Sequence, residues 1–170
     1  MFVIKPKKVR IESSLSKKQI IERYERKTVS FKARGSIIGI SGLLKKYKLS
    51  EIYYGNRNGD KIRVSHHAPK KKDGSSTTFY GTVSETENAT VIEGKIMKPV
   101  TTCVFAAVWL VCVLFFALVC YALENTGGAA AFSATAIIGF LIMFLDGGKT
   151  VKLMDFLNKI SDTENKNSKE

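Results

Sequence analysis

Two long uncharged runs, separated by a single acidic residue, constrain this chain more than any other feature. Residues 99–123 contain no charged side chain, Glu124 interrupts, and residues 125–145 are uncharged again. A helix needs about 20 mostly apolar residues to cross the roughly 30 Å hydrocarbon core of a bilayer. The polar, glycine-containing turn that follows Glu124 is too short to hold a domain. The sequence therefore predicts a transmembrane hairpin over residues 99–145, with spans at about 100–123 and 128–145.

The charge balance differs sharply on the two sides of this hairpin. Residues 1–98 contain 22 Lys and Arg against 9 Asp and Glu, a net charge of +13, whereas the rest of the chain sums to −1. Lys and Arg near membrane ends stay on the cytoplasmic side, and they flank the two spans but are missing from the turn. We therefore expect an integral membrane protein with two passes and both termini in the cytoplasm. Its expected parts are a basic domain at 1–98, the hairpin at 99–145, and an amphipathic helix with a disordered tail at 146–170.

Local patterns predict an α+β fold for the basic domain. Residues 2–14 suit a strand with one solvated face, and Ser16 with Gln19 matches the capping box that begins a helix over residues 17–27. From residue 51 to residue 97, turn signals that include Asn58-Gly59 separate β-branched and aromatic runs. We expect a small antiparallel meander of four strands there, preceded by the N-terminal strand and helix.

Two further segments complete the secondary structure prediction. Residues 29–50 are ambiguous, because residues 35–48 place apolar side chains at helical spacing but contain three glycines. A helix and a buried strand followed by a short basic segment are both compatible with this pattern. After the hairpin, Leu153, Phe156, Leu157 and Ile160 share one face of a short amphipathic helix.

Two short motifs carry a resemblance to a known group of proteins. Phe79-Tyr80-Gly81 lies in one predicted strand, and Ile92-Glu93-Gly94 lies in the strand that leads into the hairpin. With this order of parts, the chain resembles a group of small bacterial membrane proteins with a β-rich cytoplasmic domain followed by a two-helix transmembrane hairpin. The resemblance implies a place in the bacterial cell membrane and a helix-grip arrangement, with the sheet curled around the helix at 150–160. It implies no activity.

The sequence lacks the residue patterns of common catalytic and metal sites. His66 and His67 are the only histidines, and adjacent strand residues point to opposite faces of a sheet. Because no Cys or carboxylate accompanies them at ligand spacing, we expect a histidine pair at the surface or at a hairpin end. No Gly-x-Ser-x-Gly sequence and no pair of carboxylates suggests a nucleophile or an acid–base site. We expect a protein without enzymatic activity and without catalytic, cofactor-binding or metal-binding residues.

Clusters of lysine in the basic domain are candidates for contact with a membrane surface. Anionic lipids attract each nearby Lys or Arg with about 1 kcal/mol. The alternative is that these lysines are only the solvated face of a positive-inside domain. Nucleic acid is not an expected partner, because aromatic residues at strand spacing, such as Phe79 and Tyr80, are more often part of the core. The candidate lipid contacts are Lys45, Lys46, Lys48, Lys70, Lys71, Lys72, Lys95 and Lys98.

Small residues recur every four positions in the second span, at Ala131, Thr135 and Gly139. Such a stripe lets helix backbones approach closely, either within the hairpin or between two copies of the chain. Neither span carries the embedded charge that usually marks an ion pathway. The function we expect is a membrane-anchored interaction domain that contacts anionic lipid, a hydrophobic ligand or a protein partner. An oligomeric pore-type effector is the alternative, and a small enzyme with an unrecognised site is a third possibility.

Overall fold

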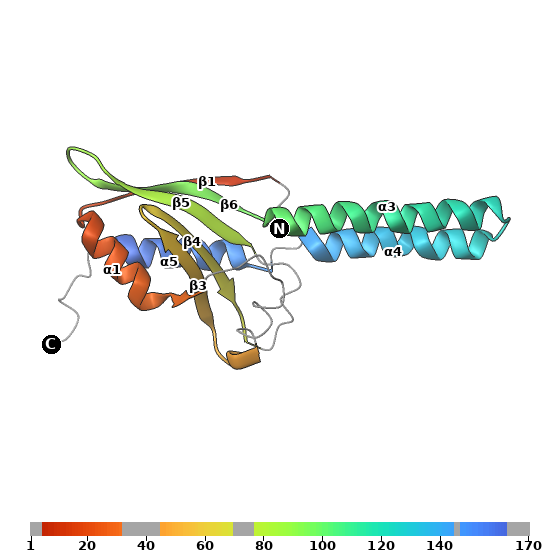
Figure 1. The fold of residues 1–170 in the computed structure, drawn as a ribbon, viewed down its shortest axis with the longest axis horizontal. Coiled ribbons are helices and arrows are strands. Elements are labelled where there is room, and N and C mark those ends of the chain that lie inside the picture. The colour runs from red at the N-terminus through yellow and green to blue at the C-terminus, as the bar shows by residue number, and fades with distance from the viewer. Residues whose placement is uncertain (1–4, 32–44, 70–76, 145–146, 163–170) are drawn as a thin grey trace.

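A six-stranded sheet with two helices packed on one face leads into a long helical hairpin (Figure 1). The computed structural model describes residues 5–31, 45–69, 77–144 and 147–162. The elements are β1 (Lys7–Ser13), α1 (Lys17–Lys27), β2 (Val29–Ser30), β3 (Ile52–Asn58), β4 (Lys61–His67), β5 (Thr78–Glu85), β6 (Thr90–Met97), α3 (Val100–Ala122), α4 (Thr126–Phe144) and α5 (Lys149–Ser161).

Helix α1 begins where the capping box predicts. The Ser16 hydroxyl accepts a hydrogen bond from the Gln19 amide, and the Gln19 side chain accepts one from the Ser16 amide, so two otherwise unpaired amides are satisfied. Ile20 and Tyr24 lie one turn apart and are buried against the sheet. The Tyr24 hydroxyl donates to the backbone oxygen of Arg63 at 2.7 Å, which joins α1 to β4.

The sheet confirms the predicted meander and extends it at both edges. Its strand order is β1-β6-β5-β4-β3-β2, and every neighbouring pair is antiparallel except β2 with β3. Local patterns gave no sign of the two-residue strand β2, because its pairing depends on a strand more than 20 residues further along the chain. The sequence also carries a turn signal at residues 70–74, but this turn and most of the ambiguous segment 29–50 lie outside the described residues.

The glycines of the two short motifs pack together on the inner face of the sheet, the face that α1 and α5 cover. Gly81 on β5 and Gly94 on β6 lie directly opposite each other, and the fully buried ring of Phe79 packs beside them. A Cβ built on Gly94 would lie 2.8 Å from the Phe79 ring, and one on Gly81 would lie 2.3 Å from it. Such distances between a Cβ and a ring atom are too short for a real contact, so only glycine at both positions leaves room for the Phe79 ring.

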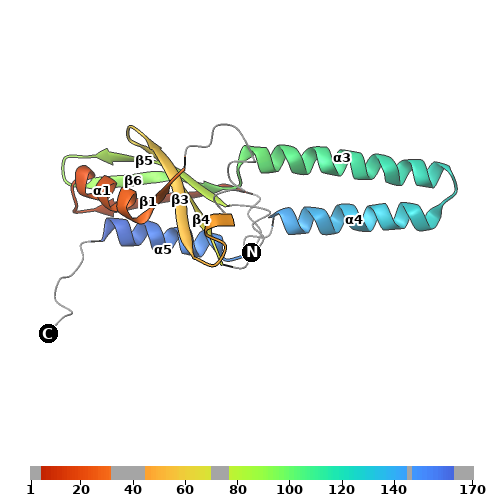
Figure 2. The same ribbon diagram turned by 60° about the horizontal axis from the view of Figure 1, so that its bottom comes forward.

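Helix α5 completes the core although it follows the hairpin in sequence. Its four predicted apolar residues, Leu153, Phe156, Leu157 and Ile160, are buried in the same cluster as the inner side chains of the sheet and of α1. At its far end the Ser13 hydroxyl of β1 donates to the backbone oxygen of Ser161. The folded domain is therefore built from chain segments on both sides of the hairpin, as Figure 2 shows.

Helices α3 and α4 are each long and apolar enough to cross a membrane. They pack on one another and leave large aliphatic side chains such as Val111 and Ile142 mostly exposed, which is unfavourable in water. Helix α4 begins at Thr126, two residues earlier than expected, because the Asn125 side chain accepts a hydrogen bond from the Gly128 amide and caps the helix.

The glycine pair gives a test of the core. We expect Gly94→Ala to lower the free energy of unfolding by about 1–3 kcal/mol, the usual cost of overpacking, because the new methyl group meets the Phe79 ring and the Tyr80 carbonyl. Thermal and chemical unfolding of the full chain in detergent, followed by circular dichroism, would measure this change. Gly127→Ala is the matched control, since only the Asn125 side chain comes within 4 Å of its Cβ. Equal stability of the two variants would contradict the packing role of Gly94.

Candidate functional site

One end of the domain lies next to the helical hairpin, and we call it the hairpin end. Strand β6 runs into α3 through two residues, and four residues join α4 to α5. Strand β4 ends at this same end, because Ser65 pairs with Thr78 and Thr78 pairs with Met97, the last residue of β6. Strand β3 begins there too, since Ile52 pairs with His67. Figures 1 and 2 show the end of β6 and the beginning of α5 at the base of the hairpin. Residues at the hairpin end are therefore those closest to any membrane that the hairpin enters.

The connection from α4 to α5 depends on two glycines. Gly147 and Gly148 have φ values of 58° and 82°, in the left-handed region that side chains disfavour. Gly148 is also the residue before the first turn of α5, and its oxygen accepts the Lys152 amide. Gly147 and Gly148 therefore form the left-handed turn that leads directly into the amphipathic helix α5.

A polar cluster joins the beginning of α5 to the sheet at the hairpin end. The Glu51 carboxylate lies 2.8 Å from Nε2 of His66 and 3.2 Å from the ammonium of Lys152. The Tyr53 hydroxyl donates to the backbone oxygen of Lys152 at 3.2 Å, and its ring stacks on Phe156. We call Glu51, Tyr53, His66 and Lys152 the Glu51 cluster. It ties the first turns of α5 to the neighbouring strands β3 and β4.

The prediction of a histidine pair at the surface is wrong. Both His66 and His67 are 3% exposed, although they are the last two residues of β4 and so do lie at the end of a β-hairpin, the other place that the sequence allowed. His66 packs against the Tyr53 ring on the inner face, and strand alternation places His67 on the opposite face, as expected. Within the described part of the chain, no three His, Cys, Asp or Glu side chains gather in a way that could hold a metal ion.

Burial controls the ionisation of His66. It lowers the pKa of the imidazole below its ordinary value of 6.5, because a charged ring is poorly solvated there, while the Glu51 carboxylate opposes this shift. Because a carboxylate can only accept, Nε2 of His66 carries the proton and Nδ1 is left as an acceptor. Nδ1 is buried and has no hydrogen-bond donor among the described residues. The hydrogen bond from His66, and then the one from Lys152, lower the pKa of Glu51.

The structure brings some of the predicted lipid-contact lysines together and separates others. Lys45, Lys46 and Lys48 are exposed in a short segment that ends beside Glu51 and includes Leu49, whose side chain is 74% exposed. We call residues 45–49 the lysine segment. The Glu51–Lys152 ion pair places it near the beginning of α5, whose exposed Lys152 adds another positive charge.

The remaining candidate lysines lie elsewhere. Lys95 is exposed on the face of the sheet opposite the helices, and Lys98 is only 2% exposed. Lys70, Lys71 and Lys72 lie outside the described residues. Sequence reasoning did not find Glu51 or Lys152, because they are 101 positions apart and neither belongs to a recognisable motif.

The small-residue stripe of the second span is divided between two faces of α4. A Cβ on Gly139 would lie 2.7 Å from the Trp109 indole nitrogen, so this glycine lets the indole of α3 approach α4 closely. Ala131 and Thr135 are exposed and turned away from α3, and the Thr135 hydroxyl donates to the Ala131 oxygen of its own helix. Gly139 therefore contributes to packing within the hairpin, whereas the other two residues do not.

Comparison with known proteins gives no match, whether with protein family models, with curated proteins or with solved structures. The function must therefore be argued from the geometry of this chain.

The pKa of His66 predicts how stability depends on pH. Because the pKa is lower in the folded state than in the unfolded state, the unfolded state binds more protons once the pH falls below about 6.5, and stability decreases. Thermal unfolding of the full chain in detergent between pH 7.5 and 5.5 should show this decrease, and His66→Gln should reduce it. His67→Gln, which keeps His66, is the control and should retain it. An unchanged slope in His66→Gln would show that His66 is not responsible.

Proposed function

We propose that this protein is a membrane-anchored interaction domain whose hairpin end contacts anionic lipid. The observation that carries the proposal is the position of the lysine segment, which the Glu51 cluster holds next to the junction between α5 and the hairpin. Three exposed lysines and an exposed leucine form the combination that favours a lipid interface, since the cations attract anionic headgroups and the leucine enters the apolar boundary.

Two observations support a hairpin that returns the chain to the side it came from. Helix α5 packs in the same core as strands that precede the hairpin, so both must be on one side of a membrane that α3 and α4 cross. Lys and Arg flank the hairpin at this end, which favours the cytoplasmic side for the domain and both termini. The resemblance to bacterial proteins makes the bacterial cell membrane the proposed location.

A hydrophobic ligand held between sheet and helix is less favoured as the partner. Phe79 and Phe156 are almost fully buried within the layer between the strands and α5, and the polar Glu51 cluster lies at its hairpin end. A ligand in this layer would have to displace α5 and expose the core, whereas the lysine segment is exposed without rearrangement.

Fluorescence quenching in vesicles tests the contact with lipid. In the full chain, with its three native cysteines changed to alanine, Leu49→Cys carries a polarity-sensitive dye, and nitroxide lipids report its depth. We expect stronger quenching in vesicles with about a third anionic lipid than in neutral vesicles, and weaker quenching at high salt because salt screens the attraction. Adding Lys46→Glu and Lys48→Glu should abolish the dependence on anionic lipid.

The matched control carries Lys18→Glu and Lys159→Glu, which make the same charge change on exposed side chains of α1 and α5 away from the hairpin end. It should behave like the parent protein. Quenching that is indifferent to anionic lipid and to salt, or that both double variants reduce equally, would overturn the proposed lipid contact.

Cysteine labelling tests the proposed orientation. In the same cysteine-free chain, Glu124→Cys should react with a membrane-impermeant maleimide added to intact bacterial cells, because the turn lies outside. Lys159→Cys, on α5, should react only after the cells are opened. The reverse pattern would contradict a cytoplasmic domain, and labelling of both residues in intact cells would show that the orientation is mixed.

A further inference from the structure

The face of the sheet opposite α1 and α5 is exposed over part of its central strands, around Arg63 and Tyr80, whereas Ser65, His67 and Thr78 of the same face are buried toward the hairpin end. Strand alternation turns Lys8, Lys95, Tyr80, Arg63 and Asn56 to this face, and the strand register places them in one row from β1 to β3. We call this surface the open face. The lysines of the row are exposed and the other three side chains are half-buried.

The charges of the open face are arranged unfavourably for the isolated protein. Lys8 lies directly opposite Lys95, and like charges in this position destabilise a sheet. A second row on the same face adds Arg10 and Lys61, together with Glu93 opposite Arg10. The other carboxylate of this face, Glu12, pairs with Arg10.

In the described part of the chain, four open-face cations have no ion-pair partner: Lys8, Lys61, Arg63 and Lys95. This excess of cations without ion-pair partners would attract an anionic partner.

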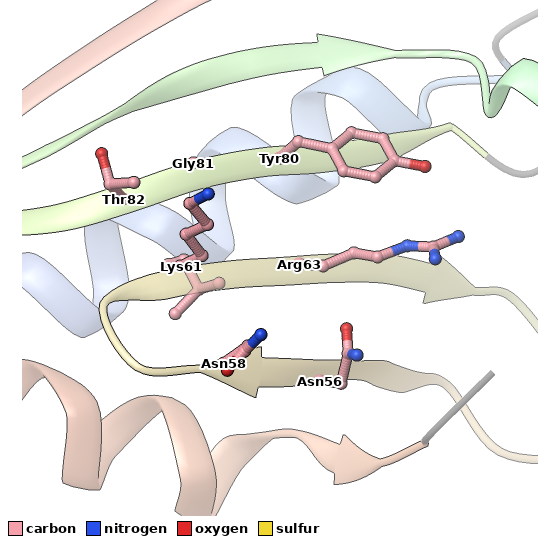
Figure 3. A pocket seen from close by; sticks show the side chains of 8 residues that line it. Asn56, Asn58, Lys61, Arg63, Tyr80, Gly81 and Thr82 are labelled. Carbon is pink, nitrogen blue, oxygen red and sulfur yellow. The ribbon is translucent and has the colours of Figure 1, made fainter. Parts of the chain in front are cut away.

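A shallow hollow of about 310 Å³ lies within this surface (Figure 3). Tyr80 and Arg63 extend side by side along neighbouring strands, and the guanidinium lies 5.1 Å from the centre of the phenol ring. The amides of Asn56 and Asn58 project from β3, and Lys61 reaches toward β5. The hollow therefore combines a flat aromatic and guanidinium surface with amide groups and free cations.

A membrane surface does not fit this site. Strands β1 and β6 run roughly along the axis of the hairpin in both views, so the open face is turned sideways from a membrane that the hairpin crosses (Figures 1 and 2). An acidic peptide would satisfy the cations but would make no use of the flat surface of Tyr80 and Arg63. Stacking on aromatic rings and guanidinium planes is how proteins hold unpaired bases.

The spread of the cations favours a chain of phosphates over a single one. From β1 to β4 the open face spans three strand spacings, about 14 Å, which is more than one nucleotide covers. Single-strand binding surfaces combine cations that follow the backbone with rings on which bases stack. We propose that the open face binds single-stranded nucleic acid, with a base on Tyr80 and Arg63 and phosphates on the surrounding lysines.

The position of Tyr80 corrects the expectation that it is a core residue. Phe79 is fully buried in the core, but Tyr80 lies half-buried on the open face.

Fluorescence anisotropy of labelled oligonucleotides tests the proposal. The full chain in nanodiscs of neutral phosphatidylcholine is titrated into ten-residue oligo(U) and oligo(dT). We expect binding that weakens about 50-fold between 50 and 200 mM salt, the dependence for four phosphate contacts on a single strand. Tyr80→Ala should raise the Kd at least about fivefold, the lower end of the effect of losing one stacked base, and Tyr80→Phe should restore it.

Two charge-reversed proteins serve as controls for general attraction. Lys61→Glu with Lys95→Glu should weaken binding strongly. Lys46→Glu with Lys48→Glu, which alters the lysine segment and not the open face, should leave the Kd within about twofold. This separates the present inference from the proposed lipid contact, because each depends on different residues.

Several results would overturn the inference. They are the absence of oligonucleotide binding at 50 mM salt, equal weakening by the two charge-reversed proteins, and an unchanged Kd in Tyr80→Ala. Competition by uridine monophosphate at concentrations near the Kd of the oligonucleotide would show a mononucleotide site instead. Equal competition by poly-glutamate would show a site for acidic polymers without base recognition.

Discussion

The structure depends on the burial of the apolar face of α5 against the sheet. A sheet with one apolar face must cover that face, and α1 covers only part of it through Ile20 and Tyr24. The rest is covered by Leu153, Phe156, Leu157 and Ile160, which belong to a segment beyond the hairpin. Since the loss of a large buried side chain usually costs several kcal/mol, the domain is not expected to be stable without its last helix. The hairpin is thus an insertion within a single folded domain.

Because the hairpin is inserted within the domain, the chain must pass from the hairpin back into the domain core over a short junction. The apolar helix α4 must end and an amphipathic helix must begin within four residues, and Gly147 and Gly148 make this possible through their left-handed backbone. The Glu51 cluster then ties the first turns of α5 to β3 and β4. A movement of the hairpin relative to the domain would act first on these contacts. The lysine segment adjoins the same cluster, so the proposed contact with a membrane surface would be physically linked to the attachment of α5.

The two faces of the sheet differ in their side chains and in their burial. The inner face is filled by Phe79, the glycines beside it and the helices, and it accounts for stability. Around Tyr80, the open face carries cations without an ion-pair partner among the described residues, one of which, Arg63, packs over the Tyr80 ring. Lys95 illustrates the division, since a lysine that the sequence grouped with lipid contacts belongs by its strand position to the open face.

Local information in the sequence was sufficient for most of the secondary structure. The capping box at Ser16 determines where α1 begins, Asn58-Gly59 determines the first hairpin turn, and the apolar runs determine α3 and α4, because each signal acts within a few residues. Strand β2 was not predicted, because a two-residue strand is too short to produce a periodic pattern. Helix α4 begins two residues before its predicted start, because the hydrogen bond that caps it at Asn125 involves a single side chain and leaves no periodic pattern either.

The sequence by itself therefore determined the order of elements, the apolar hairpin and the excess of positive charge before it. Only the tertiary structure decided which residues meet. It buried both histidines, joined Glu51 to Lys152 across 101 positions, and separated Phe79 in the core from Tyr80 on the open face. The physical reason is that burial and pairing depend on neighbours distant in sequence, whereas helix caps, turns and hydrophobic periodicity depend on neighbours along the chain.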